Sequence, residues 1–266
     1  MPGFGLAMGT TLLYLGLLVM VPLATIVIKT AEIPLSRLLE VVASERALAS
    51  YRLTFGAAFA GASVNLVFGV VVAWVLVRYR FPGKRWIDGL VDLPFALPTA
   101  VAGIALAAIY AENGWLGAPL AALGIKVAYT PLGVAVALTF IGLPFVVRTV
   151  QPVLADLDPA LEEAAATLGA TRWTTLRRVV LPELLPAAIT GFVLAFARAL
   201  GEYGSVIFIA GNLPMKSEIT ALLIMVQLEQ YDYAAATGIA LVFLVASFAL
   251  LLLLNRLSRG RRGAPW

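Results

Sequence analysis

Two opposite charges stand out because they lie inside a strongly apolar part of the chain. Arg198 and Glu202 are four residues apart, so on a helix they share one face and can form an ion pair. An unpaired arginine at mid-bilayer costs about 2.5–3.5 kcal/mol, so both charges should face protein or a water-filled path. A structural ion pair and a transport pathway or gate both fit this pattern. Ser205, Pro98 and Thr99 complete the candidate pathway residues.

Other kinds of chemistry are excluded by composition. The chain contains neither cysteine nor histidine, which excludes thiol catalysis, disulfides, Cys/His zinc sites and a histidine proton relay. The segment 211–217 superficially resembles a phosphate loop, but it lacks the glycine before Lys216 and its spacer is too short. We therefore expect no catalytic residue, no metal site and no cofactor in this chain. The energy for transport must come from a partner protein or an ion gradient.

A polar segment at residues 154–182 interrupts the apolar sequence and carries the signals of two short helices. Asp158 can cap the start of the first helix, and Gly169 lies where a left-handed residue would end it. Thr171 can cap a second helix, which Pro182 is expected to close. The sequence predicts a helix, a bend and a second helix at a membrane face. An ordinary solvated loop would carry the same capping signals.

The composition places these features in a polytopic membrane protein. The chain has 266 residues, of which 61% are hydrophobic and 13% charged, so it is too apolar for a soluble domain. We expect an all-α fold with a single transmembrane domain over residues 1–266. Asp92 is expected to cap the third span, and Pro98 to kink it. Six spans are predicted, at residues 10–28, 53–77, 93–110, 131–150, 183–210 and 233–254.

The distribution of Lys and Arg predicts the orientation. Twelve basic residues fall on the side of the polar segment, in the second-to-third loop, around the polar segment and in the C-terminal tail. Six fall on the other side. Because cytoplasmic loops carry the excess of Lys and Arg, the polar segment and both termini are predicted to be cytoplasmic. The twelve are Arg78, Arg80, Lys84, Arg85, Arg148, Arg172, Arg177, Arg178, Arg256, Arg259, Arg261 and Arg262.

The spacing within the polar segment is more specific than its capping signals. Glu-Ala-Ala at 163–165, three residues, Gly169, nine residues and Val-Val-Leu-Pro at 179–182 resemble the EAA loop of ABC-importer permeases, with Val179 where that family has Ile. In that family the loop holds a coupling helix that docks into a groove of the cytoplasmic ATPase. The resemblance implies ATPase-coupling roles for Glu163, Ala164, Ala165, Gly169, Leu181 and Pro182.

Four further stretches resemble the T-type permease of bacterial sulfate/thiosulfate ABC importers. They are RYRFPG at 78–83, DLPFALPTAVAG at 92–103, PFVVRTVQPV at 144–153 and GEYGSVIFIAGN at 201–212. The resemblance covers residues 9–255. It implies the type I ABC-importer permease fold and a subunit of the bacterial inner membrane that is not itself an enzyme. In that reading the chain forms the translocation pathway of an ATP-driven sulfate/thiosulfate importer.

The resemblance also implies partners. These are a second permease subunit, either W-type or an identical copy, two ATPase subunits that bind the ATP, and an extracytoplasmic sulfate-binding protein. Membrane lipid surrounds the chain, and nucleic acid is not expected. A permease for molybdate or tungstate is an alternative, because those permeases share the EAA loop. An ion-coupled secondary carrier is a second alternative, against which the missing histidine and the scarcity of intramembrane acids argue.

Overall fold

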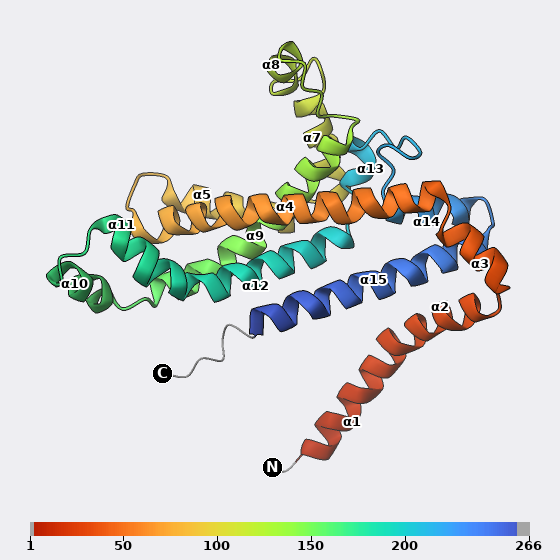
Figure 1. Cartoon of the computed structure of the whole chain (residues 1–266), viewed down its shortest axis with the longest axis horizontal. Coiled ribbons are helices and arrows are strands. Elements are labelled where there is room, and N and C mark those ends of the chain that lie inside the picture. The colour runs from red at the N-terminus through yellow and green to blue at the C-terminus, as the bar shows by residue number, and fades with distance from the viewer. Residues whose placement is uncertain (1–2, 260–266) are drawn as a thin grey trace.

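The computed structural model describes residues 3–259, so Arg261 and Arg262 of the basic tail lie outside the described part. Within that part, helices and their connections make up the whole fold (Figure 1). The helices are α1 (Phe4–Leu15), η1 (Gly16–Met20), α2 (Val21–Ala31), α3 (Leu35–Val42), α4 (Glu45–Arg78), α5 (Lys84–Val91), α6 (Leu93–Ala96), α7 (Thr99–Tyr110), α8 (Gly117–Ala122), α9 (Pro131–Ala155), α10 (Pro159–Thr167), α11 (Arg172–Thr175), η2 (Leu176–Val180), α12 (Leu181–Leu200), α13 (Val206–Ile209), α14 (Thr220–Glu229) and α15 (Tyr233–Arg259).

Three long helices, α4, α9 and α12, pack side by side at the centre of the molecule (Figure 1). Helix α4 has 34 residues, which at 1.5 Å per residue is about 51 Å. That length exceeds the ~30 Å hydrocarbon core of a bilayer, so α4 is longer than a perpendicular crossing of that core requires. The faces that meet between these helices carry the buried alanines, valines and leucines of the core.

The centre of this three-helix packing is Val146 of α9, which is fully buried between two glycines. A Cβ atom on Gly69 of α4 would lie 2.8 Å from the Val146 side chain, and one on Gly191 of α12 would lie 2.7 Å from the Val146 Cα atom. Both distances are shorter than van der Waals contact. Glycine at both positions lets the helices approach closely, as small residues do where helices pack in membranes.

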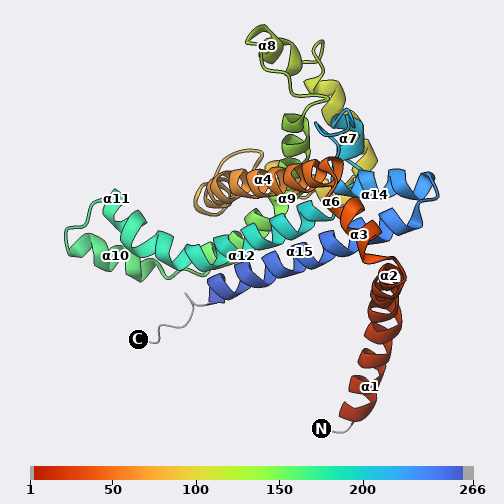
Figure 2. The same cartoon turned by 45° about the vertical axis from the view of Figure 1, so that its right-hand side comes forward.

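The N-terminal helices lie apart from this core. No residue of α1 is buried, and Figures 1 and 2 both show α1 diverging from the bundle. The stretch Phe4–Ala31, which joins α1, η1 and α2, is nevertheless long and apolar enough to cross a membrane. Only its α2 end packs on the rest of the chain, against α15.

Among the described residues, five helices are long and apolar enough to span a membrane, and the predicted third span is not one of them. It is divided into α6 and α7, because Pro98 lacks an N–H and disfavours a helical conformation at Leu97, which is extended. A sixth crossing therefore consists of two helical pieces. The expected kink at Pro98 is a full break. The five helices that are long and apolar enough to span a membrane are Phe4–Ala31, Glu45–Arg78, Pro131–Ala155, Arg172–Leu200 and Tyr233–Arg256.

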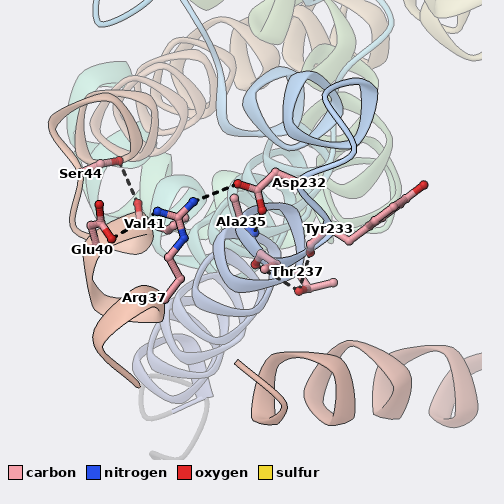
Figure 3. A network of polar contacts seen from close by, with 9 residues as sticks. Arg37, Glu40, Val41, Ser44, Asp232, Tyr233, Ala235 and Thr237 are labelled. Atoms are coloured by element: carbon pink, nitrogen blue, oxygen red, sulfur yellow. Dashed lines mark hydrogen bonds and ion pairs between the residues drawn. The ribbon is translucent and has the colours of Figure 1, made fainter. Parts of the chain in front are cut away.

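At the end of the molecule opposite the polar segment, ion pairs connect α3 and the start of α4 to Asp232 and Glu218. Arg37 of α3 donates to Asp232 at 3.2 Å and to Glu40 at 3.2 Å, and Asp232 accepts from the Ala235 N–H at the start of α15 (Figure 3). Arg46 donates two hydrogen bonds, of 2.6 and 2.7 Å, to the buried carboxylate of Glu218. These contacts tie α3 and the start of α4 to segments almost two hundred residues further along the chain.

Candidate functional site

The polar segment forms the first of two candidate sites, and its helix caps are those that the sequence predicts. The Asp158 carboxylate accepts from the Ala160 N–H at 2.9 Å, and the Thr171 hydroxyl accepts from the Thr174 N–H at 3.2 Å. Each bond satisfies one of the amide groups that a helix leaves free at its start. Helix α10 and helix α11 are therefore fixed at their N-terminal ends by their own sequence.

Gly169 produces the bend between α10 and α11. Its φ angle is +80°, the left-handed region that glycine adopts without a steric penalty. The Gly169 N–H donates to the Ala166 carbonyl, and the Ala170 N–H donates to the Ala165 carbonyl, both at 3.0 Å. This pair of bonds is the Schellman motif, which satisfies the last carbonyls of α10.

The bend presents apolar side chains that the sequence analysis did not single out. Leu168, directly before Gly169, is 88% exposed, and Trp173 is 65% exposed. Glu163 and Ala164 are exposed on α10, and Ala165 is half-buried. An exposed leucine at the tip of a rigid turn is the kind of side chain that anchors a helix in a partner's groove. The signal in the sequence was an apolar residue next to the capping glycine.

Pro182 does not close the second helix, so this part of the prediction is wrong. The helix that starts at Arg172 continues without interruption through Leu181 and Pro182 to Leu200. The missing N–H of Pro182 is accommodated because the preceding turn, η2, is a π-helix, the usual form of a helix bulge. The polar segment is thus rigidly continuous with α12.

An arginine at the end of α4 holds that helix against the polar segment. Arg78, the last residue of α4, forms an ion pair with Glu162 of α10 and lies over the Trp74 ring at 5.5 Å. The cation–π contact, which lies within α4, orients the guanidinium toward Glu162. Helix α10 is therefore attached to the end of a core helix as well as to its own chain.

Arg148 of α9 binds two acidic side chains, Asp88 of α5 and Asp92 at the junction between α5 and α6. It donates to Asp92 at 2.8 and 2.5 Å and to Asp88 at 2.6 Å. The expected role of Asp92 as a helix cap is therefore wrong, because its carboxylate pairs with Arg148 and makes no capping bond. The hydrogen bond from Arg148 lowers the pKa of Asp88 below its ordinary value.

The second candidate site lies where two helix breaks meet. The break before Thr99 packs against the non-helical segment 201–205, which follows α12. A Cβ atom on Gly204 would lie 2.2 Å from the Thr99 hydroxyl, and one on Gly103 would lie 2.2 Å from the Ser205 carbonyl. Because segment 201–205 is not helical, the predicted fifth span, 183–210, consists of two helices, α12 and α13. Non-helical backbone at membrane depth is tolerated only where it is buried in protein or lines a water-filled cavity.

Arg198 and Glu202 form the predicted ion pair at this break, with 2.7 Å between Nη2 and Oε2. Glu202 lies beyond the end of α12, so a shared helix face is only part of the reason for the pairing. Its other oxygen accepts from the N–H and the hydroxyl of Ser205, both at 2.8 Å. The Glu202 side chain is 2% exposed, whereas the Arg198 side chain is 34% exposed.

Arg198 belongs to a face of α12 that the described chain leaves uncovered. Leu194, one turn earlier, is 45% exposed, and Gly201 is exposed. Glu202 thus holds the guanidinium from the buried side, and a third of the Arg198 side chain remains exposed. The site contains one partly exposed cation, its buried counter-charge and the facing non-helical backbone.

The described chain combines membrane-length apolar helices, two facing helix breaks and an exposed helical bend. Residues 65–263 match the family model described as binding-protein-dependent transport system inner membrane component. The chain therefore belongs to this family, the permease subunits of ABC importers, which are non-catalytic components of the inner membrane.

Two curated relatives are identical to this chain at about half of the aligned positions. The chain is 52% identical over 264 residues to the "Sulfate transport system permease protein CysT" of Escherichia coli K12, covering 98% of this chain and 95% of that protein. It is 49% identical over 255 residues to the protein of the same name from Synechocystis, covering 96% of this chain and 89% of that one.

Solved structures share the fold at low sequence identity. A chain of the bacterial alginate ABC transporter, in complex with an alginate pentasaccharide-bound periplasmic protein, has a TM-score of 0.78 at 16% identity, covering 98% of this chain and 95% of that one. A chain of the MetNI methionine ABC transporter has a TM-score of 0.59 at 17% identity, covering 86% and 99%. The all-α permease fold is therefore that of ABC importers.

Proposed function

We propose that this chain is the T-type permease subunit of an ATP-driven importer for sulfate and thiosulfate. The two CysT relatives described above support sulfate as the cargo. The proposed partners are a second permease subunit, W-type or identical, two ATPase subunits that bind the ATP, and an extracytoplasmic sulfate-binding protein. The complex lies in the bacterial inner membrane, with both termini of this chain in the cytoplasm.

The observation that carries the coupling role is the exposed bend at Leu168 and Gly169. It is capped on both sides, attached to α4 through Arg78 and continuous with α12. A force on this bend therefore reaches α12 through unbroken helix. We infer that the ATPase binds here, and that Glu163, Ala164, Ala165, Gly169, Leu181 and Pro182 form or support the contact.

The pathway role is proposed for the residues at the facing helix breaks. Arg198 supplies the positive charge, and Glu202, which Ser205 binds in turn, holds it from the buried side. Pro98 creates the break before Thr99, whose hydroxyl lies at the junction. Because Glu202 neutralises much of the Arg198 charge, an anion is attracted weakly and can leave again.

Uptake by the reconstituted importer tests the proposed function. The chain, its partner subunits and the binding protein are placed in vesicles, and labelled sulfate, thiosulfate and molybdate are supplied outside. We expect ATP-dependent accumulation of sulfate and thiosulfate. Accumulation of molybdate alone would favour the molybdate and tungstate alternative. Uptake driven by an ion gradient without ATP would favour a secondary carrier.

The proposed orientation can be measured separately, because the chain contains no cysteine. Ala166→Cys in the polar segment and Asn113→Cys in the connection between α7 and α8 introduce single thiols at exposed positions. In intact spheroplasts, a membrane-impermeant maleimide should label the Asn113→Cys protein and should label the Ala166→Cys protein only after lysis. Labelling of Ala166→Cys from outside would contradict the orientation.

A further inference from the structure

A groove between α4 and α12 adjoins the polar segment and shares Arg177, Leu181 and Pro182 with it. It has a volume of about 430 Å³, within the ~300–1,000 Å³ typical of small-molecule pockets. One wall comes from the third quarter of α4, and the other from η2 and the first two turns of α12. The lining residues are Leu66, Val67, Val70, Arg177, Leu181, Pro182, Leu184, Leu185 and Ala188.

The groove is apolar along its length and open to the surroundings of the bundle. Val67 is 60% exposed and Leu185 is 42% exposed, so apolar side chains line its open side. Both walls belong to helices that are long and apolar enough to span a membrane. The surrounding medium at this depth is therefore hydrocarbon, and an apolar chain is the ligand whose chemistry fits the walls.

One end of the groove is charged. Arg177 is the only charged residue in the lining, and it is exposed. Within the described part of the chain it forms no ion pair and no side-chain hydrogen bond. Glu183, the nearest acidic residue along the chain, does not line the groove. An unpaired guanidinium at the mouth of an apolar groove complements a ligand that has one anionic end.

The length of the groove along α12 agrees with the thickness of the inner half of a bilayer. On α12 the lining runs from Leu181 to Ala188, which at 1.5 Å per residue is about 10 Å. Arg177 lies before this stretch, next to the polar segment. In the orientation proposed above, on which this inference rests, that end faces the cytoplasm. The cytoplasmic leaflet is the one that carries anionic lipids.

We propose that this groove binds one anionic phospholipid of the cytoplasmic leaflet. An acyl chain lies along the apolar walls, and the headgroup phosphate pairs with Arg177. The bound lipid contacts Leu181 and Pro182, so it packs directly against the junction between the polar segment and α12. A second copy of a permease helix is the competing occupant, and it would not require the charge of Arg177.

The test uses the complete detergent-purified importer and counts bound lipids by native mass spectrometry. Phosphatidylglycerol and phosphatidylcholine with the same acyl chains are titrated separately. For Arg177→Gln we expect about fivefold weaker binding of phosphatidylglycerol, corresponding to the loss of one basic contact, and unchanged binding of phosphatidylcholine. Arg178→Gln, which changes the neighbouring exposed arginine outside the lining, should keep the native preference.

A second pair of variants tests the apolar part. Val67→Trp should obstruct the groove and weaken the binding of both lipids, whereas Val71→Trp, equally on α4 but outside the lining, should not. The proposal is overturned if Arg177→Gln binds phosphatidylglycerol as the native protein does. It is also overturned if a photo-crosslinker at position 67 captures another permease helix. Neither readout involves sulfate, so failure here leaves the proposed function intact.

Discussion

Replacing Gly169 with valine should leave the subunit in the membrane and abolish ATP-driven uptake. A Cβ atom at this position would meet no other atom within 4 Å, so the effect comes from the backbone alone. A side chain in the left-handed region costs about 1–2 kcal/mol, and a β-branched one is strongly disfavoured there. The turn should therefore open, and the ATPase should no longer co-purify with the permease.

Gly169→Asn is the matched control, because asparagine tolerates the left-handed conformation. It should retain most of the ATPase binding and uptake that Gly169→Val loses. If both variants bind the ATPase normally and transport sulfate at the native rate, this bend is not the coupling surface.

The same surface can be tested without disturbing the turn. Leu168→Asp places a charge on a side chain that is 88% exposed, so folding of this subunit should be unaffected. If Leu168 is a central anchor, the loss is at least about 2 kcal/mol, or roughly 30-fold in the dissociation constant of the ATPase. Leu123→Asp, at a residue 75% exposed that follows α8 and lies far from the polar segment (Figure 1), should have no such effect.

Arg198→Ala has the second large expected effect. The variant leaves the Glu202 carboxylate buried with only its bonds to Ser205. Removing one partner of a buried ion pair costs about 3–5 kcal/mol, and the lower end applies because a third of the Arg198 side chain is exposed. The melting temperature of the purified importer and its sulfate uptake should both fall.

The double variant Arg198→Ala with Glu202→Gln separates stability from transport. Glutamine is neutral and keeps an oxygen that can accept from Ser205, so no lone buried charge remains. The melting temperature should return most of the way to the native value, and sulfate uptake should stay low. Recovery of uptake together with stability would mean that the pair is structural and that Arg198 has no role in the pathway.

Local signals allowed much of this molecule to be predicted. The caps at Asp158 and Thr171 and the bend at Gly169 depend on residues within a few positions of one another, so the sequence displays them directly. The all-helical membrane fold follows from the long apolar runs. The pairing of Arg198 with Glu202 is confirmed because four residues bring the two groups together even though the helix ends between them.

The errors share a physical cause, which is that distant contacts override local preferences. Asp92 looked like a helix cap, but Arg148 from another helix takes its carboxylate. Pro182 looked like a helix end, but a π-helical turn absorbs its missing N–H. The apolar groove on α4 and α12 combines residues more than a hundred positions apart, so no local pattern indicates it.

The packing of Val146 between Gly69 and Gly191 has a consequence for how this chain can evolve. Both glycines are in direct contact with Val146. A Cβ atom added to either glycine would lie too close to Val146. A methyl group gained at one glycine must therefore be matched by a smaller residue at position 146. Among homologous permeases, these three positions should covary, with the summed size of their side chains held nearly constant.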